Sequence, residues 1–168
     1  ASTASVFGSI DWSAKTWLFL MHWASAFPIY YWARTIGAKR GGAVIAALAY
    51  VLSFLHTHTI IWTGALQMSG VFLAFPMVLF SIEKILAGKE AKWIPVLSIS
   101  TACLVLFHQG YAASGLQLAV LYAIMRWAIP SHGTRPGARR VILAGAGMAA
   151  GILICSFFLW NTIFNKEG

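Results

Sequence analysis

Long apolar runs joined by short polar turns are the feature that most constrains how this chain can fold. The runs lie at residues 16–32, 43–61, 65–82, 93–129 and 141–163. A helix crosses the hydrocarbon core of a bilayer with about 20 apolar residues, which is the length of most of these runs. Only 10% of the residues are charged, whereas ordinary soluble domains carry about 25%. The sequence therefore predicts a single all-helical domain, residues 1–168, embedded in a membrane.

The run at residues 93–129 is too long for one span, and the basic residues indicate how it divides. If the chain turns back at "FHQGYAASG", ten of the twelve basic residues fall on one side and only Lys15 and Lys166 on the other. Lys and Arg concentrate in cytoplasmic loops. The pattern therefore predicts six spans, including two short helices at about 93–107 and 111–128. Both termini are then extracytoplasmic, in what we expect to be a bacterial inner membrane.

The net charge of +8 has two further consequences under this topology. The basic residues serve as orientation signals, and no basic and aromatic pattern typical of a nucleic-acid surface is present. Anionic headgroups attract basic residues near the cytoplasmic surface. We therefore expect lipid headgroup contacts from the arginines of the last basic loop, which are Arg126, Arg135, Arg139 and Arg140.

Proline and glycine residues within the spans predict local packing features. Pro28 and Pro76 each remove a backbone hydrogen bond, so each should kink its helix or end it early, with neighbouring helices covering the defect. Gly147 and Gly151 form a GxxxG pair in the last span. Such pairs allow two helices to approach closely, so this face is expected to pack against a helix of this chain or of another.

Four of the five histidines lie in the outer half of the predicted topology, and His132 lies in an inner loop. His56 and His58, in "FLHTHTIIWTGALQ", are two residues apart and diverge on a helix, and no carboxylate nearby can orient them. We interpret this stretch as the polar cap of a helix end at the outer interface and not as a metal site, and a cofactor contact or a substrate site are the alternatives. If a cofactor such as a chlorin or haem is bound here, one histidine should ligate it alone, either His22 or His108.

Several function classes are disfavoured by what the spans lack. No carboxylate lies inside the predicted spans, which argues against a proton pump or a cation-coupled transporter. Cys103 and Cys155 lie in apolar runs without the spacing of a zinc site. No phosphate-binding glycine loop, HExxH or nucleophile elbow is present.

The central stretch resembles the membrane cores of bacterial GT-C-fold glycosyltransferases, the YfhO-like branch in particular. The resemblance rests on "YYWARTIGAKRGGAVIAALAYVLS", "FLAFPMVLFSIEKILAGKEAKWIPVLSIS" and "QGYAASGLQLAVLYAIMRW", about 110 residues in all. Such enzymes use a lipid-linked sugar donor at the extracytoplasmic face, with acidic residues in the first outer loop. This sequence has no such loop, and Asp11 is the only acid near the outer face before the first span.

Two hypotheses of function remain open at this point. The first is an accessory or structural subunit of a larger membrane complex, respiratory or photosynthetic, which contacts other membrane subunits and lipids. It would retain a GT-C-like helical module without the catalytic loop, and no catalytic residue is assigned. The alternative is a fragment of a glycosyltransferase that uses polyprenyl-phosphate-linked sugars.

Overall fold

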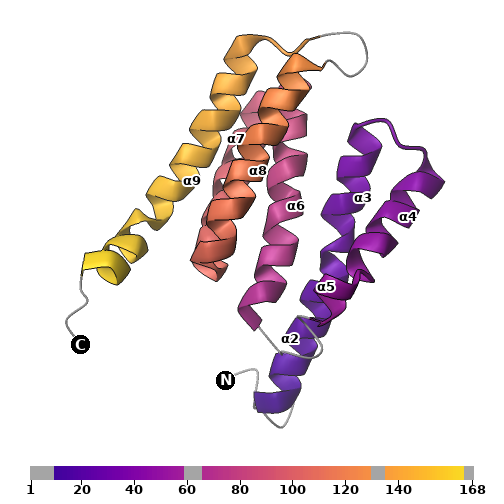
Figure 1. Ribbon diagram of the computed structural model, residues 1–168, viewed down its shortest axis with the longest axis vertical. Coiled ribbons are helices and arrows are strands. Elements are labelled where there is room, and N and C mark those ends of the chain that lie inside the picture. The colour runs from indigo at the N-terminus through magenta and orange to yellow at the C-terminus, as the bar shows by residue number, and fades with distance from the viewer. Residues whose placement is uncertain (1–9, 59–65, 130–134, 165–168) are drawn as a thin grey trace.

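The computed structural model describes residues 10–58, 66–129 and 135–164, and the regular structure within these segments is entirely helical (Figure 1). The helices are α2 (Ile10–Ala24), α3 (Ala26–Thr35), α4 (Arg40–Val51), α5 (Phe54–Thr57), α6 (Leu66–Leu86), α7 (Glu90–Phe107), α8 (Gln109–Ala128) and α9 (Ala138–Phe164). Three parts of the described chain are long and apolar enough to cross a membrane, namely Gln67–Leu86, Glu90–Phe107 and Ala138–Ser156. The prediction of a helical, membrane-embedded protein is thus confirmed.

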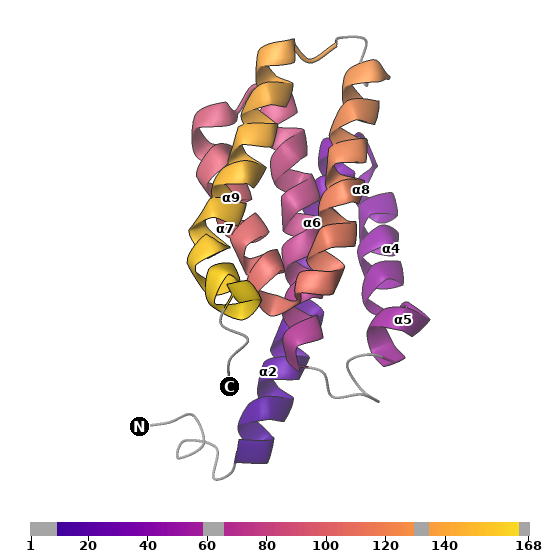
Figure 2. The same ribbon diagram turned by 60° about the vertical axis from the view of Figure 1, so that its left-hand side comes forward.

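The core lies where α6, α7 and α9 pack together, and α6 also contacts α2, α3 and α8. The side chains of Val78 and Ile82 on α6, and of Leu97 and Leu104 on α7, are fully buried there. The helix α4 lies farther out and packs chiefly on α3, so α3 and α4 form a hairpin beside the bundle (Figures 1 and 2).

The predicted break in the long apolar run is confirmed. The helix α7 ends at Phe107 and α8 begins at Gln109, with His108 in extended conformation between them. The Nδ1 atom of His108 accepts a hydrogen bond from the backbone N–H of Tyr111 at 3.4 Å, which caps the first turn of α8.

The ends of α3, α6 and α8 and the starts of α4, α7 and α9 lie together at one end of the molecule, which we call the basic end (Figure 1). The turns after α3 and α6 contain glycines with positive φ, Gly37 at 106° and Gly88 at 91°. In both, backbone N–H groups after the helix donate to carbonyls of its last turn, as in Lys89 N to Lys84 O at 3.0 Å. This is the Schellman termination, in which glycine adopts the left-handed conformation without a Cβ penalty.

The predicted spans 16–32 and 43–61 are each interrupted in the structure. In the first, α2 ends at Ala24, four residues before Pro28, because a proline has no N–H to donate to the carbonyl four residues earlier. In the second, α4 ends at Val51 and Ser53 then caps the short helix α5, accepting from the N–H of His56 at 3.4 Å. Serine at such a position favours starting a new helix.

Pro76 does not end α6, because a neighbouring helix compensates for the missing hydrogen bond. The carbonyl that Pro76 leaves without its helical donor is that of Phe72, four residues earlier. The hydroxyl of Tyr50, on α4, donates to this Phe72 oxygen at 2.8 Å. The expectation that another helix covers the proline defect is confirmed at this position.

We therefore predict that Tyr50→Phe lowers the free energy of unfolding by about 1 kcal/mol, as expected for a hydrogen bond to a buried carbonyl. Pro76→Ala supplies the matched background, since an alanine at this position would donate its own N–H to the Phe72 carbonyl. In that background Tyr50→Phe should have a much smaller effect, measured by unfolding in mixed detergent micelles. Equal effects in both backgrounds would show that the hydroxyl does not compensate for Pro76.

The small-residue face of α9 packs on α7 within this chain. A Cβ added at Gly151 would collide with the Ser98 carbonyl oxygen and the Thr101 side chain, and one at Gly147 would press on Leu97 at 3.1 Å. The Ser98 hydroxyl donates to the Gly147 carbonyl at 2.9 Å. The thiol of Cys155, one turn further along α9, donates to the Ala102 carbonyl at 3.2 Å. The GxxxG face was expected to pack on a helix of this chain or of another chain. In the structure it packs on α7 of this chain.

Candidate functional site

The two interrupted helices meet at a pair of histidines. His22 lies in the last turn of α2, just before the break at Ser25, and His56 lies on α5, just after the break in α4. Their ring centroids are 4.7 Å apart and the ring planes are inclined at 69°. Both side chains are buried, with 8% of His22 and 1% of His56 exposed. Irregular backbone at membrane depth is tolerated where it is covered by protein or lines a cavity, and such breaks often mark binding sites.

The surroundings of His56 fix its ring. It stacks on Phe72 of α6 with centroids 4.1 Å apart, and its Nδ1 lies 3.3 Å from the Tyr50 carbonyl oxygen at the end of α4. The hydroxyl of Thr57 donates to the Val51 carbonyl at 3.4 Å. His56 and Thr57 thus contact carbonyls that the end of α4 leaves open, in keeping with the capping interpretation. The His56 side chain is also buried among these neighbours, with 1% of it exposed.

Each histidine of the pair keeps one buried ring nitrogen without a hydrogen-bond partner, Nδ1 of His22 and Nε2 of His56. A buried polar atom left in this state costs about 1–3 kcal/mol. The backbone carbonyl of His22 takes part in the kink, because the Ser25 hydroxyl donates to it at 2.6 Å. The pair therefore brings together two buried ring nitrogens without hydrogen-bond partners, which makes it the strongest candidate site in the described chain.

A cavity of about 450 Å³ lies beside His22, between the end of α2 and the break after α4. Its walls are Lys15, Leu18, Phe19, His22, Trp23, Leu52 and Thr57. None of these residues is acidic, and Lys15 is the single lysine or arginine among them. A mostly apolar cavity with a few polar groups at one end is the usual form of a small-molecule site.

The other predicted histidine positions do not join this site. His108 lies at the turn between α7 and α8, where it caps α8 and contacts Tyr111. His58 is exposed and its ring lies against Phe54. His132 lies outside the described residues. Ligation of a chlorin or haem by His22 or His108 alone stays a prediction. In the described residues, no three His, Cys, Asp or Glu side chains are grouped as a metal cluster.

The meeting of His22 and His56 is not evident from the sequence. Both histidines belong to the predicted outer half, but a continuous helix through residues 43–61 makes His58 the natural neighbour of His56. The signals that could reveal the pair are Pro28 after His22 and Ser53 before His56, which together break both helices at the same depth. Two interrupted helices in neighbouring spans are a recognised indication of a binding site.

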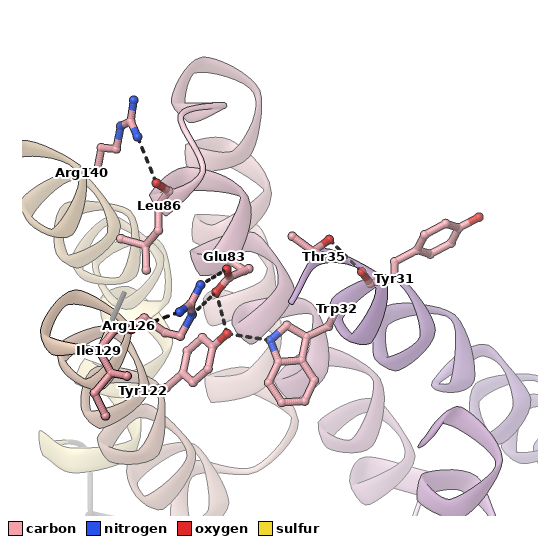
Figure 3. A network of polar contacts seen from close by, with 9 residues as sticks. All are labelled: Tyr31, Trp32, Thr35, Glu83, Leu86, Tyr122, Arg126, Ile129 and Arg140. Carbon is pink, nitrogen blue, oxygen red and sulfur yellow. Dashed lines mark hydrogen bonds and ion pairs between the residues drawn. The ribbon is translucent and has the colours of Figure 1, made fainter. Parts of the chain in front are cut away.

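At the basic end, two of the four arginines expected at lipid headgroups have partners within the protein (Figure 3). Arg126 forms a two-point ion pair with Glu83, with its Nε 2.8 Å from one carboxylate oxygen and its Nη2 2.5 Å from the other. Arg140 donates to Glu90 at 3.1 Å and to the Leu86 carbonyl at 3.2 Å. Arg135 and Arg139 are exposed. Headgroup contact stays a prediction, with these two as its strongest candidates.

The Glu83 carboxylate gathers further partners from separate helices. The Tyr122 hydroxyl donates to it at 2.7 Å, and the indole N–H of Trp32 donates to the Tyr122 oxygen at 2.9 Å. This network therefore ties α3 to α6 and α8, as Figure 3 shows. Glu83 belongs to the apolar segment Gln67–Leu86, whereas the span predicted from the sequence ends at residue 82 and leaves Glu83 outside it.

The burial of His56 changes the expected outcome of its replacement. For a purely interfacial cap, replacing His56 and His58 together would lower stability only slightly. Given the stacking on Phe72, we now expect His56→Gln to lower the free energy of unfolding by about 1 kcal/mol, the usual contribution of an aromatic pair. His58→Gln is the matched control and should change it by less than about 0.5 kcal/mol. Equal, small effects in detergent unfolding experiments would contradict this packing.

Comparisons with known proteins do not assign this chain to a class, so its class is argued from its structure. No family of known proteins, no curated protein and no solved structure matches it. The apolar helices define the class as a membrane-embedded helical protein. The resemblance to GT-C-fold glycosyltransferases is neither supported nor opposed by these comparisons.

Proposed function

We propose that the chain is a six-span component of a larger membrane assembly, oriented with its basic end in the cytoplasm of a bacterium. The observation that carries this proposal is the incomplete packing of the α3–α4 hairpin. The helix α4 has 12 residues, which cover about 18 Å at 1.5 Å per residue, whereas the hydrocarbon core is about 30 Å thick. The His56 ring and the Thr57 hydroxyl contact the carbonyls at the end of α4. This short helix packs chiefly on α3 in the described chain, however, which leaves its outward side for a neighbouring subunit to cover.

The outward face of α4 supports a protein neighbour. It presents Val44, Ile45 and Leu48 together with the small residues Gly41 and Ala49, all of them exposed. Nothing lies within 4 Å of a Cβ built at Gly41. Small residues between larger apolar ones let a second helix approach closely in a membrane. The helix packs on α3 alone along most of its length, so this face is available to another subunit.

The test is to extract the protein from its native membrane in a mild detergent and measure the mass and composition of the particle. A photo-crosslinking residue at Ile45, 69% exposed on α4, should capture a defined partner subunit. The same residue at Ile99, 60% exposed on α7, is the matched control and should capture much less. A monodisperse particle that contains one copy of the protein and no other subunit, with equal and weak capture at both positions, would contradict the proposal.

A second candidate function is a portion of a lipid-linked glycosyltransferase, and the cavity beside His22 is the observation that favours it. The cavity combines apolar walls with the Lys15 cation in the predicted outer half, which suits an amphipathic anion. The two acids whose side chains the structure describes, Glu83 and Glu90, lie at the basic end in ion pairs. The catalytic acids that the resemblance implies would therefore have to come from another segment.

The flanking gene sequence separates the two candidates. An upstream continuation of the reading frame that encodes a further span and an acidic outer loop would favour the transferase. Transfer of a labelled sugar from a polyprenyl-phosphate donor by the protein encoded there would then establish it, and loss of transfer in Lys15→Gln would assign the cavity to the donor.

A further inference from the structure

The His22 and His56 pair has an unexplained chemical feature. Two buried imidazoles from separate helices each leave one ring nitrogen unpaired, and the rings lie 4.7 Å apart. Neither the capping of α4 nor the kink at Ser25 uses these nitrogens. The Tyr50 carbonyl lies beside Nδ1 of His56, which leaves Nε2 as its open nitrogen. A ligand that satisfies both nitrogens at once would remove two separate desolvation penalties.

From this geometry we infer that His22 and His56 together hold one monovalent copper ion, Cu(I), with a third coordination position open to the neighbouring cavity. Imidazole nitrogen is a good ligand for copper. A structural zinc ion takes four protein ligands, and the described residues bring only two to this point. A divalent ion would bring a larger uncompensated charge into the apolar surroundings than a monovalent one, and none of the described residues that line the cavity is acidic.

The ring positions are compatible with a bent, three-coordinate ion. With metal–nitrogen bonds of about 2.0 Å, two imidazoles in this arrangement have ring centres roughly 5–5.5 Å apart. The observed 4.7 Å is a few tenths of an ångström shorter, which a small rotation of the His22 ring would accommodate. The stacking on Phe72 holds His56 in place during such a rotation. Lys15 has a flexible stem, so its ammonium can turn toward the headgroups and away from the ion.

The test uses the full 168-residue chain in detergent, titrated anaerobically with Cu(I) against a competing chelator. We expect one equivalent of Cu(I) to be retained, and X-ray absorption should show two nitrogen donors at about 2.0 Å. Retention of no Cu(I), or absorption data without two imidazole ligands, would overturn the proposal. A water molecule that bridges the two ring nitrogens would then be the explanation of the pair. Both measurements are made on the wild-type chain, so neither depends on the folding of a variant.

Variants then assign the ligands. His22→Gln and His56→Gln should each weaken Cu(I) binding by more than the roughly 10–100-fold that loss of an outer-shell partner costs. His22→Met keeps a soft donor at this position and should recover most of the affinity. His58→Gln and His108→Gln are the matched controls and should bind as the wild type does. Equal weakening by His58→Gln would move the site to the "HTH" stretch and overturn the assignment. This inference is independent of the proposed assembly, because the site needs no partner subunit.

Discussion

Replacing Glu83 with methionine is expected to destabilise the folded chain by about 3 kcal/mol, because the substitution removes the Glu83 counter-charge from the largely buried Arg126 guanidinium. Only 4% of the Glu83 side chain and 16% of the Arg126 side chain are exposed. The same substitution removes the acceptor of the Tyr122 hydroxyl, and Tyr122 in turn accepts from Trp32. The contact between α3 and α8 should therefore loosen together with the ion pair. The measurement is reversible unfolding in mixed micelles with a rising fraction of denaturing detergent.

The second ion pair of the basic end supplies the control. Glu90 and Arg140 are more exposed, at 22% and 40% of their side chains. Exposed pairs contribute about 0–1 kcal/mol, so Glu90→Gln should have a small effect. Combining Glu83→Met with Arg126→Met should recover much of the loss, since no charge is then left unpaired. If the double variant is less stable than Glu83→Met alone, the loss does not come from an unpaired arginine.

Gly151→Leu is expected to lower the free energy of unfolding by about 1–3 kcal/mol or more, as overpacking in a close-packed interior does. Even a Cβ at this position collides with the Ser98 carbonyl and the Thr101 side chain on α7. Backbone cannot rotate aside as a flexible side chain can, so α9 would have to move away from α7. The hydrogen bond from Ser98 to the Gly147 carbonyl should weaken with it.

Gly145 is the matched control on the same helix. It is exposed, and nothing lies within 4 Å of a Cβ built there. Gly145→Ala should leave stability unchanged or raise it by up to about 1 kcal/mol, the difference in helix propensity between the two residues. If Gly145→Ala and Gly151→Ala destabilise the chain equally, the result would contradict a close contact between α7 and α9 at Gly151.

The turns of the fold were predictable from the sequence because charge and length determine them. The basic residues placed the break in the long apolar run at His108, where α7 ends. The helices extend further into the basic flanks than the predicted spans do, as α6 does to Leu86. The reason is that Lys, Arg and Glu are good helix formers, and the Glu83 charge within this extension is paired with Arg126.

The interior polar contacts could not be predicted in the same way. The pairing of Glu83 with Arg126 joins α6 to α8 across 43 positions of sequence, and hydrophobic periodicity contains no information on such a partner. The meeting of His22 and His56 depends on two helix breaks at one depth. Pro28 predicted the first, whereas the second follows from side-chain hydrogen bonds of Ser53 and Thr57 that compete with the helix.

The proposed orientation of the bundle has the basic end in the cytoplasm and the histidine pair in the outer half of the membrane. Single cysteines at Gly110, in the first turn of α8, and at Gly137, before α9, test it in a background with Cys103 and Cys155 replaced by alanine. Both glycines are exposed, and neither has a close neighbour that a side chain would displace. In intact cells an impermeant thiol reagent should label Gly110→Cys and reach Gly137→Cys only after permeabilisation. The reverse labelling pattern would contradict the account.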